Sequence, residues 1–147
     1  MSEIALVSGT PAKAPWHLWV VGILAVLWSA SGAYTIMAAQ AGRLPGIDPE
    51  EAAYYAAQPM WFAAVTDVAL VAAIGGAVAL LLRSRWAVAL FGLSIIAIAV
   101  TAAYDIAAGT SRINADTGAL VATLLIWVLA VLQYVYAAAM RKRGTLR

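Results

Sequence analysis

Residues 60–82 read MWFAAVTDVALVAAIGGAVALLL, an apolar run in which Thr66 and Asp67 are the polar side chains. A helix needs about 20 apolar residues to cross a hydrocarbon core of about 30 Å, and this run is long enough. Three further runs of similar length lie at 16–38, 86–107 and 118–140. The sequence therefore predicts an all-α protein, a four-helix antiparallel transmembrane bundle whose main partner is the lipid bilayer.

The composition places the whole chain in this class. Hydrophobic residues make up 65% of it and charged residues only 11%, against about 25% charged in soluble domains. No segment is long enough for a soluble domain, so one membrane domain is expected at 16–140, between a disordered tail (1–15) and a basic tail (141–147). The first run is too long for the apolar region of a signal peptide. The absence of cysteine excludes disulfides and thiolate chemistry.

The basic residues indicate the orientation of the bundle. Seven of the nine Lys and Arg residues fall in the N-terminal tail, the 83–85 link and the C-terminal tail, which four crossings place on one side. Basic residues stay in the cytoplasm during insertion. The expected protein is a multi-pass protein of the bacterial inner (plasma) membrane with both termini cytoplasmic. Because the membrane confines the net charge of +2 to loops and tails, it does not indicate nucleic-acid binding.

Two connections carry local signals. Residues 48–51, DPEE, combine an Asp N-cap, a first-turn proline and two acids, so they predict a short helix on the outer surface after the first span. That helix would either cap the mouth of the bundle or act as a spacer. The three-residue link at 83–85 makes the second and third spans antiparallel neighbours. Gly75 and Gly76 either allow close helix packing or loosen the second span.

Asp67 and Asp105 are the acids within the spans, and an intramembrane acid is a functional candidate because a charge at a helix centre costs about 2.5–3.5 kcal/mol. Asp67 lies about 10 Å from the outer end of its helix. Polar residues of other spans fall at similar depth: Ser31, Tyr34, Thr101, Tyr104 and Thr123. They predict a polar vestibule open to the outside with Asp67 at its floor. The carboxylate would be either structural, held by hydroxyl groups, or a group that binds a proton or solute.

Asp105 falls at the C-terminal end of its span, where the helix dipole disfavours an acid by about 0.3–1 kcal/mol. A compensating partner is expected, either Arg112 in the following loop or a bound cation or solute. His17 is the only histidine and is expected to anchor the first helix at the interface. With no metal-ligand spacing, phosphate loop or nucleophile motif, the sequence predicts no cofactor, no metal site, no catalytic residue and no enzyme activity.

Several stretches are similar to one family. They are residues 16–32 (WHLWVVGILAVLWSASG), 59–61 (PMW), 83–88 (RSRWAV), 136–140 (YAAAM) and 143–147 (RGTLR). They resemble small bacterial four-span inner-membrane proteins that are commonly labelled sugar transporters or uncharacterised. Ser29 and Thr35 stand where that family often has Asn and Asp, so the resemblance assigns no functional residue here.

Three functions are consistent with these observations. The resemblance implies a small-solute, sugar-like transporter or permease component, with the vestibule residues as its binding site. A chain this small would then need a homo-oligomer or a larger membrane complex to enclose a path. The second is a non-catalytic accessory or scaffold subunit of a larger assembly, which suits the small-residue helix faces. The third, an integral-membrane enzyme, has no motif to support it.

Overall fold

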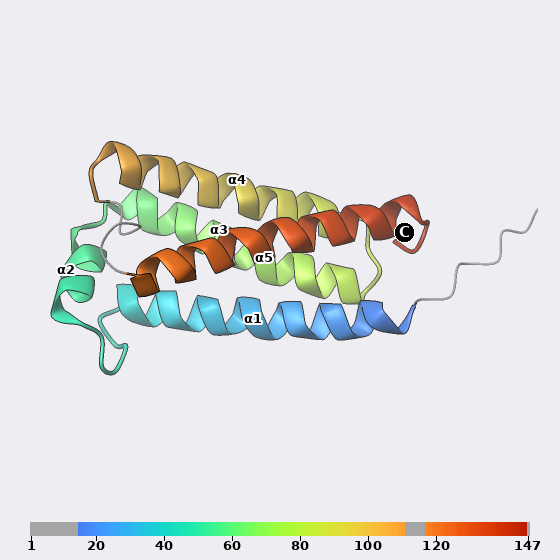
Figure 1. The fold of residues 1–147 in the computed structure, drawn as a ribbon, viewed down its shortest axis with the longest axis horizontal. Coiled ribbons are helices and arrows are strands. Elements are labelled where there is room, and N and C mark those ends of the chain that lie inside the picture. The colour runs from blue at the N-terminus through green and yellow to red at the C-terminus, as the bar shows by residue number, and fades with distance from the viewer. Residues whose placement is uncertain (1–14, 111–116, 147) are drawn as a thin grey trace, which may run out of the picture.

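The computed structural model describes residues 15–110 and 117–146. In these residues the chain forms five helices and no strand: α1 (Trp16–Gln40), α2 (Pro49–Ala57), α3 (Met60–Leu81), α4 (Trp86–Ala107) and α5 (Thr117–Lys142). All except α2 are long and apolar enough to cross a membrane. This confirms the predicted four-helix bundle with a short helix after the first span, and the protein is a multi-pass integral membrane protein (Figure 1).

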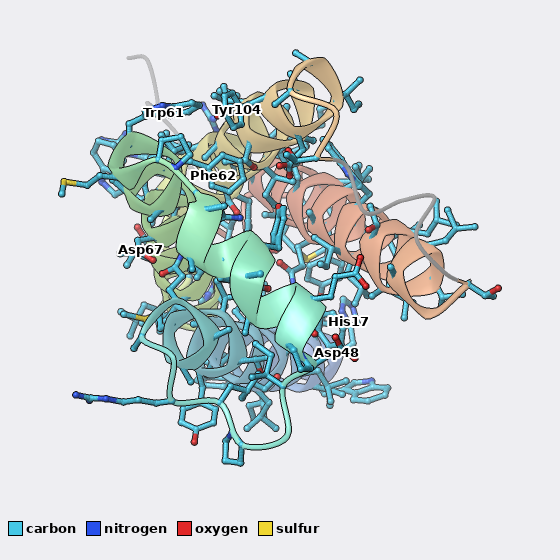
Figure 2. All side chains as sticks on the ribbon, turned by 90° about the vertical axis from the view of Figure 1, so that its left-hand side faces the viewer. His17, Asp48, Trp61, Phe62, Asp67 and Tyr104 are labelled. Atoms are coloured by element: carbon cyan, nitrogen blue, oxygen red, sulfur yellow. The ribbon has the colours of Figure 1, made fainter. Side chains whose placement is uncertain are left out.

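The start of α2 is set by the predicted cap. The Asp48 side chain accepts a hydrogen bond from the Glu50 backbone N–H at 2.8 Å, and Pro49 takes the first helical position. Two acids in the first turn complement the positive end of the helix dipole. Figure 2, which looks onto this end of the molecule, shows α2 lying across the end of the bundle. We call this the α2 end, and the opposite end, where α1 begins and α5 ends, the terminal end.

Gly76, one of the two glycines predicted to affect helix packing, and Gly22 of α1 both make room for a large side chain of a neighbouring helix. At Gly76 a Cβ atom would lie 2.9 Å from the Phe91 ring of α4, so the missing side chain allows that ring to lie against α3. Gly22 of α1 likewise leaves room for Leu81 of α3, whose side chain an added Cβ would overlap. Gly76 therefore serves close packing, and α3 continues unbroken through it.

The buried core lies toward the terminal end. Its largest fully buried side chains are Phe91, Leu18 and Leu80. Helix α5 contributes only Ala137 and Met140, both near its last turn, to the buried residues. Over the rest of its length its large apolar side chains are exposed or partly exposed. Figure 2 shows the near part of α5 standing away from the other helices, so the bundle is tightly packed at the terminal end and open at the α2 end.

The chain folds back after α5, where the sequence predicts only a basic tail. Gly144 adopts a left-handed conformation (φ 68°), and the Thr145 N–H donates to the Met140 carbonyl at 3.0 Å, which closes the helix. The turn places Leu146, 6% exposed, in the core. The Arg83 Nε–H donates to the Thr145 carbonyl at 3.1 Å. The tail is therefore an ordered part of the terminal end up to Leu146.

Candidate functional site

Asp67 does not lie at the floor of a vestibule within the bundle. At 3.6 residues per turn its position on α3 is about 180° from Gly76 and about 160° from Ala69, two residues of the buried stripe. Figure 2 shows Asp67 on the side of α3 that faces away from α5. The prediction used only the depth of Asp67, and it was wrong about the direction in which this side chain projects from α3. That direction follows from the rotation of α3, which is set by the packing of its small residues against α4.

The immediate surroundings of Asp67 are apolar. It lies at the edge of an open surface groove of about 390 Å³ between α3 and α4, whose other lining residues are Val68, Val71, Ala72, Gly75, Leu90 and Leu93. The Oδ1 atom of Asp67 is buried and has no hydrogen-bond partner in the described part of the chain. A carboxyl oxygen that is removed from solvent without a partner loses its hydration with nothing in exchange. Asp67 Oδ1 is one of two buried side-chain polar atoms without a partner in the described part of the chain, and the other is Gln40 Nε2 at the last residue of α1.

Ser31 and Tyr34 are not brought to Asp67 within the bundle. Ser31 is exposed and its hydroxyl donates to the Trp28 carbonyl of its own helix at 2.9 Å. The Tyr34 side chain is 69% exposed. Both project from α1 toward the surface that lipid covers. The polar residues of α1 consequently do not line an interior vestibule.

Thr101 and Tyr104 are also placed apart from Asp67. The Thr101 hydroxyl donates to the Ile98 carbonyl of its own helix at 3.0 Å, and Thr123 does the same to Ala119 at 2.8 Å. Tyr104 packs edge-on against Trp61, with ring centroids 4.8 Å apart. Figure 2 shows this aromatic contact at the α2 end. The threonine hydroxyls are therefore occupied by their own backbone, and Tyr104 takes part in helix packing.

Asp105 has the compensating partners that the helix dipole requires, but they are hydroxyl groups. The Tyr54 O–H of α2 donates to Asp105 Oδ2 at 2.9 Å, and the Thr110 O–H donates to Oδ1 at 3.0 Å. Burial, the hydrogen bond to Asp105 and the charge of that carboxylate all raise the pKa of Tyr54. The proposed partner Arg112 lies outside the described residues. The bond from Tyr54 ties α2 to α4, so α2 is more than a spacer.

One contact of the terminal end was not predicted from the sequence. His17 Nδ1 and the Tyr136 hydroxyl are 2.6 Å apart, which joins α1 to α5. The two residues lie near the same end of antiparallel helices, and that shared depth is the one signal for the pair that the sequence holds. Among residues 15–110 and 117–146 there is no group of His, Cys, Asp or Glu side chains that would hold a metal ion.

A comparison of this chain with protein-family models, with curated proteins and with solved structures found no match. The candidate site consists of two carboxyl groups of the spans. Asp67 lies on the outer face of α3 beside an apolar groove, and Asp105 lies at the α2 end, where two hydroxyl groups donate to it.

Proposed function

We propose that this protein is a non-catalytic subunit of an assembly in the bacterial inner membrane, with both termini in the cytoplasm. The observation that carries the proposal is the placement of Asp67, a half-buried carboxyl group without a hydrogen-bond partner among the described residues, on the outer face of α3 beside an apolar groove. An unsatisfied polar group in hydrocarbon costs several kcal/mol. The free energy is recovered when another polypeptide supplies a hydrogen-bond donor at that depth, as interhelical polar contacts in membranes do.

The orientation in this proposal follows from charge. The terminal end carries Arg141 and Lys142 in the last turn of α5 and Arg83 and Arg85 in the link between α3 and α4. Since cytoplasmic segments are rich in Lys and Arg, the terminal end is assigned to the cytoplasm and the α2 end to the outside.

The interior polar groups support a subunit role better than a solute path. The hydroxyls of Thr66, Thr101 and Thr123 each donate to a carbonyl three or four residues back in the same helix. Asp105 is engaged by Tyr54 and Thr110. Few groups therefore remain to bind a polar solute.

The proposal is tested by purifying the tagged protein in a mild detergent that preserves complexes and measuring the mass of the particle by light scattering. We expect a stoichiometric assembly, either of several copies or of this chain with other subunits. Asp67→Leu should dissociate it, whereas Leu125→Ala, at an exposed site on α5, should leave it intact. A monodisperse single copy, unchanged by the first substitution, would contradict the proposal.

Small-solute transport is a second candidate, favoured by one observation. The helices close at the terminal end, where His17 joins Tyr136 and Leu146 enters the core, and α5 stands away at the α2 end. The helices are therefore packed more closely at the terminal end than at the α2 end, as a transporter that admits its solute from the α2 side would require. Proteoliposomes loaded with a pH-sensitive dye test it with monosaccharides as probes: proton-coupled uptake should exceed that of empty vesicles and should fall in Asp105→Asn. Equal fluxes in protein-containing and empty vesicles would remove this candidate.

A further inference from the structure

Helices α1 and α3 together present a continuous apolar surface away from α5, which we call the α1–α3 face. It is formed by exposed side chains at intervals of three, four or seven residues: Ile23, Leu27 and Tyr34 on α1, and Val68, Val71 and Val78 on α3. Such intervals keep one stripe of a helix facing a partner helix. Asp67 lies on the same face, one position before Val68.

Tyr34 and Asp67 point to the same side of this pair of helices. Gly22 and Leu81 mark where α1 and α3 meet. Tyr34 is about 120° around α1 from Gly22, and Asp67 is about 40° around α3 from Leu81. Because the two helices are antiparallel, these rotations carry both side chains to the face opposite α5, where Figure 2 shows Asp67.

The two side chains also lie at nearly the same depth. Measured from the contact between Gly22 and Leu81, Tyr34 is about 18 Å along α1 and Asp67 is about 21 Å along α3. The difference of about 3 Å is within the reach of a tyrosine side chain. Tyr34 is 69% exposed and Asp67 is half-buried, and neither side chain makes a hydrogen bond within residues 15–110 and 117–146. The Oδ1 atom of Asp67 is turned into the chain, which leaves Oδ2 as the oxygen that a neighbouring molecule can reach. One chain therefore carries a free donor and a free acceptor at matching depth.

We propose that a second copy of this chain docks on the α1–α3 face, with the Tyr34 hydroxyl of each copy donating to the Asp67 carboxyl group of the other. All copies insert with the same topology, so a two-fold axis perpendicular to the membrane relates them, and α1 of one lies against α3 of its partner. The interface is then isologous and forms the hydrogen bond twice. This inference rests on the proposed assembly role and specifies its occupant.

Because the chain contains no cysteine, engineered cysteines report the contact directly. Two differently tagged full-length copies are co-expressed, one with Ala30→Cys and the other with Val71→Cys, which are about 12 Å and 15 Å from the same reference contact. Oxidation should give a disulfide-linked heterodimer. Replacing the Val71→Cys copy by one with Leu125→Cys, on exposed α5, provides the matched control and should give none. No product from the first pair, or equal product from both, would overturn the proposal.

The hydrogen bond is tested by association measured as energy transfer between labelled copies in vesicles. Tyr34→Phe should weaken association about tenfold, since two interhelical hydrogen bonds of the usual strength are lost. Tyr134→Phe, on α5, is the control and should have no effect. Asp67→Leu should weaken association similarly, and the double variant Tyr34→Phe/Asp67→Leu should be no weaker than either single variant because the two groups act as a pair.

The outcomes separate this inference from the proposed function. A complex with other subunits that contains one copy of this chain would refute the two-fold contact and leave the assembly role standing. A homo-oligomer in which Tyr34→Phe and Tyr134→Phe associate equally well would also refute the two-fold contact and leave the assembly role standing. A single copy without any partner would refute both the two-fold contact and the assembly role.

Discussion

Gly75 and Gly76 test what holds α3 against α4, because an added methyl group is crowded at one and accommodated at the other. A Cβ atom at residue 76 would lie 2.9 Å from the Phe91 ring, whereas at residue 75 the nearest atom is a methyl carbon of Leu90 at 3.5 Å. Carbon atoms attract one another best at about 3.5–4.0 Å and repel at shorter range. We therefore expect Gly76→Ala, but not Gly75→Ala, to force α4 away from α3.

The magnitude follows from two opposing effects. Overpacking a core costs about 1–3 kcal/mol of unfolding free energy, and Phe91 is only 2% exposed, so its ring is surrounded on all sides. Replacing Gly by Ala in a helix raises the unfolding free energy by up to about 1 kcal/mol, and this gain applies at both positions. The net expectation is a loss of about 1–2 kcal/mol for Gly76→Ala and a change between zero and a gain of about 1 kcal/mol for Gly75→Ala.

The assay is reversible unfolding in mixed micelles of rising dodecyl sulfate content, followed by the fluorescence of the six tryptophans. Gly32→Ala provides a second control because nothing lies within 4 Å of a Cβ atom there. Adding Phe91→Leu to Gly76→Ala should recover part of the loss, since the two sites are in contact. If Gly76→Ala and Gly75→Ala unfolded at the same detergent composition, close packing at Gly76 would not be what stabilises the pair of helices.

Three further predictions concern the two ends of the bundle. Leu146→Ala should lower the unfolding free energy by about 2 kcal/mol, because Leu146 is buried, whereas Leu132→Ala at an exposed site should change it little in the same micelle assay. The pKa of Tyr54 is raised above its ordinary value of 10.0. The neutral Tyr54 hydroxyl therefore contributes fully to the free energy of unfolding below pH 10, and this contribution is lost as the pH rises through the raised pKa. When unfolding is measured against pH, Tyr54→Phe should lack this loss. Asp48→Ala should lower the stability of helix α2 by about 0.5–2 kcal/mol, so the backbone amides of α2 should exchange hydrogen faster. An unchanged exchange rate would show that α2 does not need the Asp48 cap.

The position of each candidate side chain along the membrane normal could be read from the sequence, but its direction could not. Depth depends on the number of residues from the helix end, a local quantity, and it placed Asp67 and Tyr34 at similar levels. Direction depends on rotation about the helix axis. A transmembrane helix is apolar on all sides, so its pattern does not distinguish the face against protein from the face against lipid. For this reason the predicted vestibule was wrong, and Asp67 lies on the outer surface.

The sequence by itself determined the four spans, their antiparallel order and the start of α2 at Asp48, because hydrophobic length and helix caps act within one segment. Tertiary structure alone decided the rotation of α3, the departure of α5 from the bundle at the α2 end and the return of Leu146 into the core. These features arise from contacts between helices, such as Gly76 with Phe91, whose energy depends on the fit of two surfaces distant in the chain.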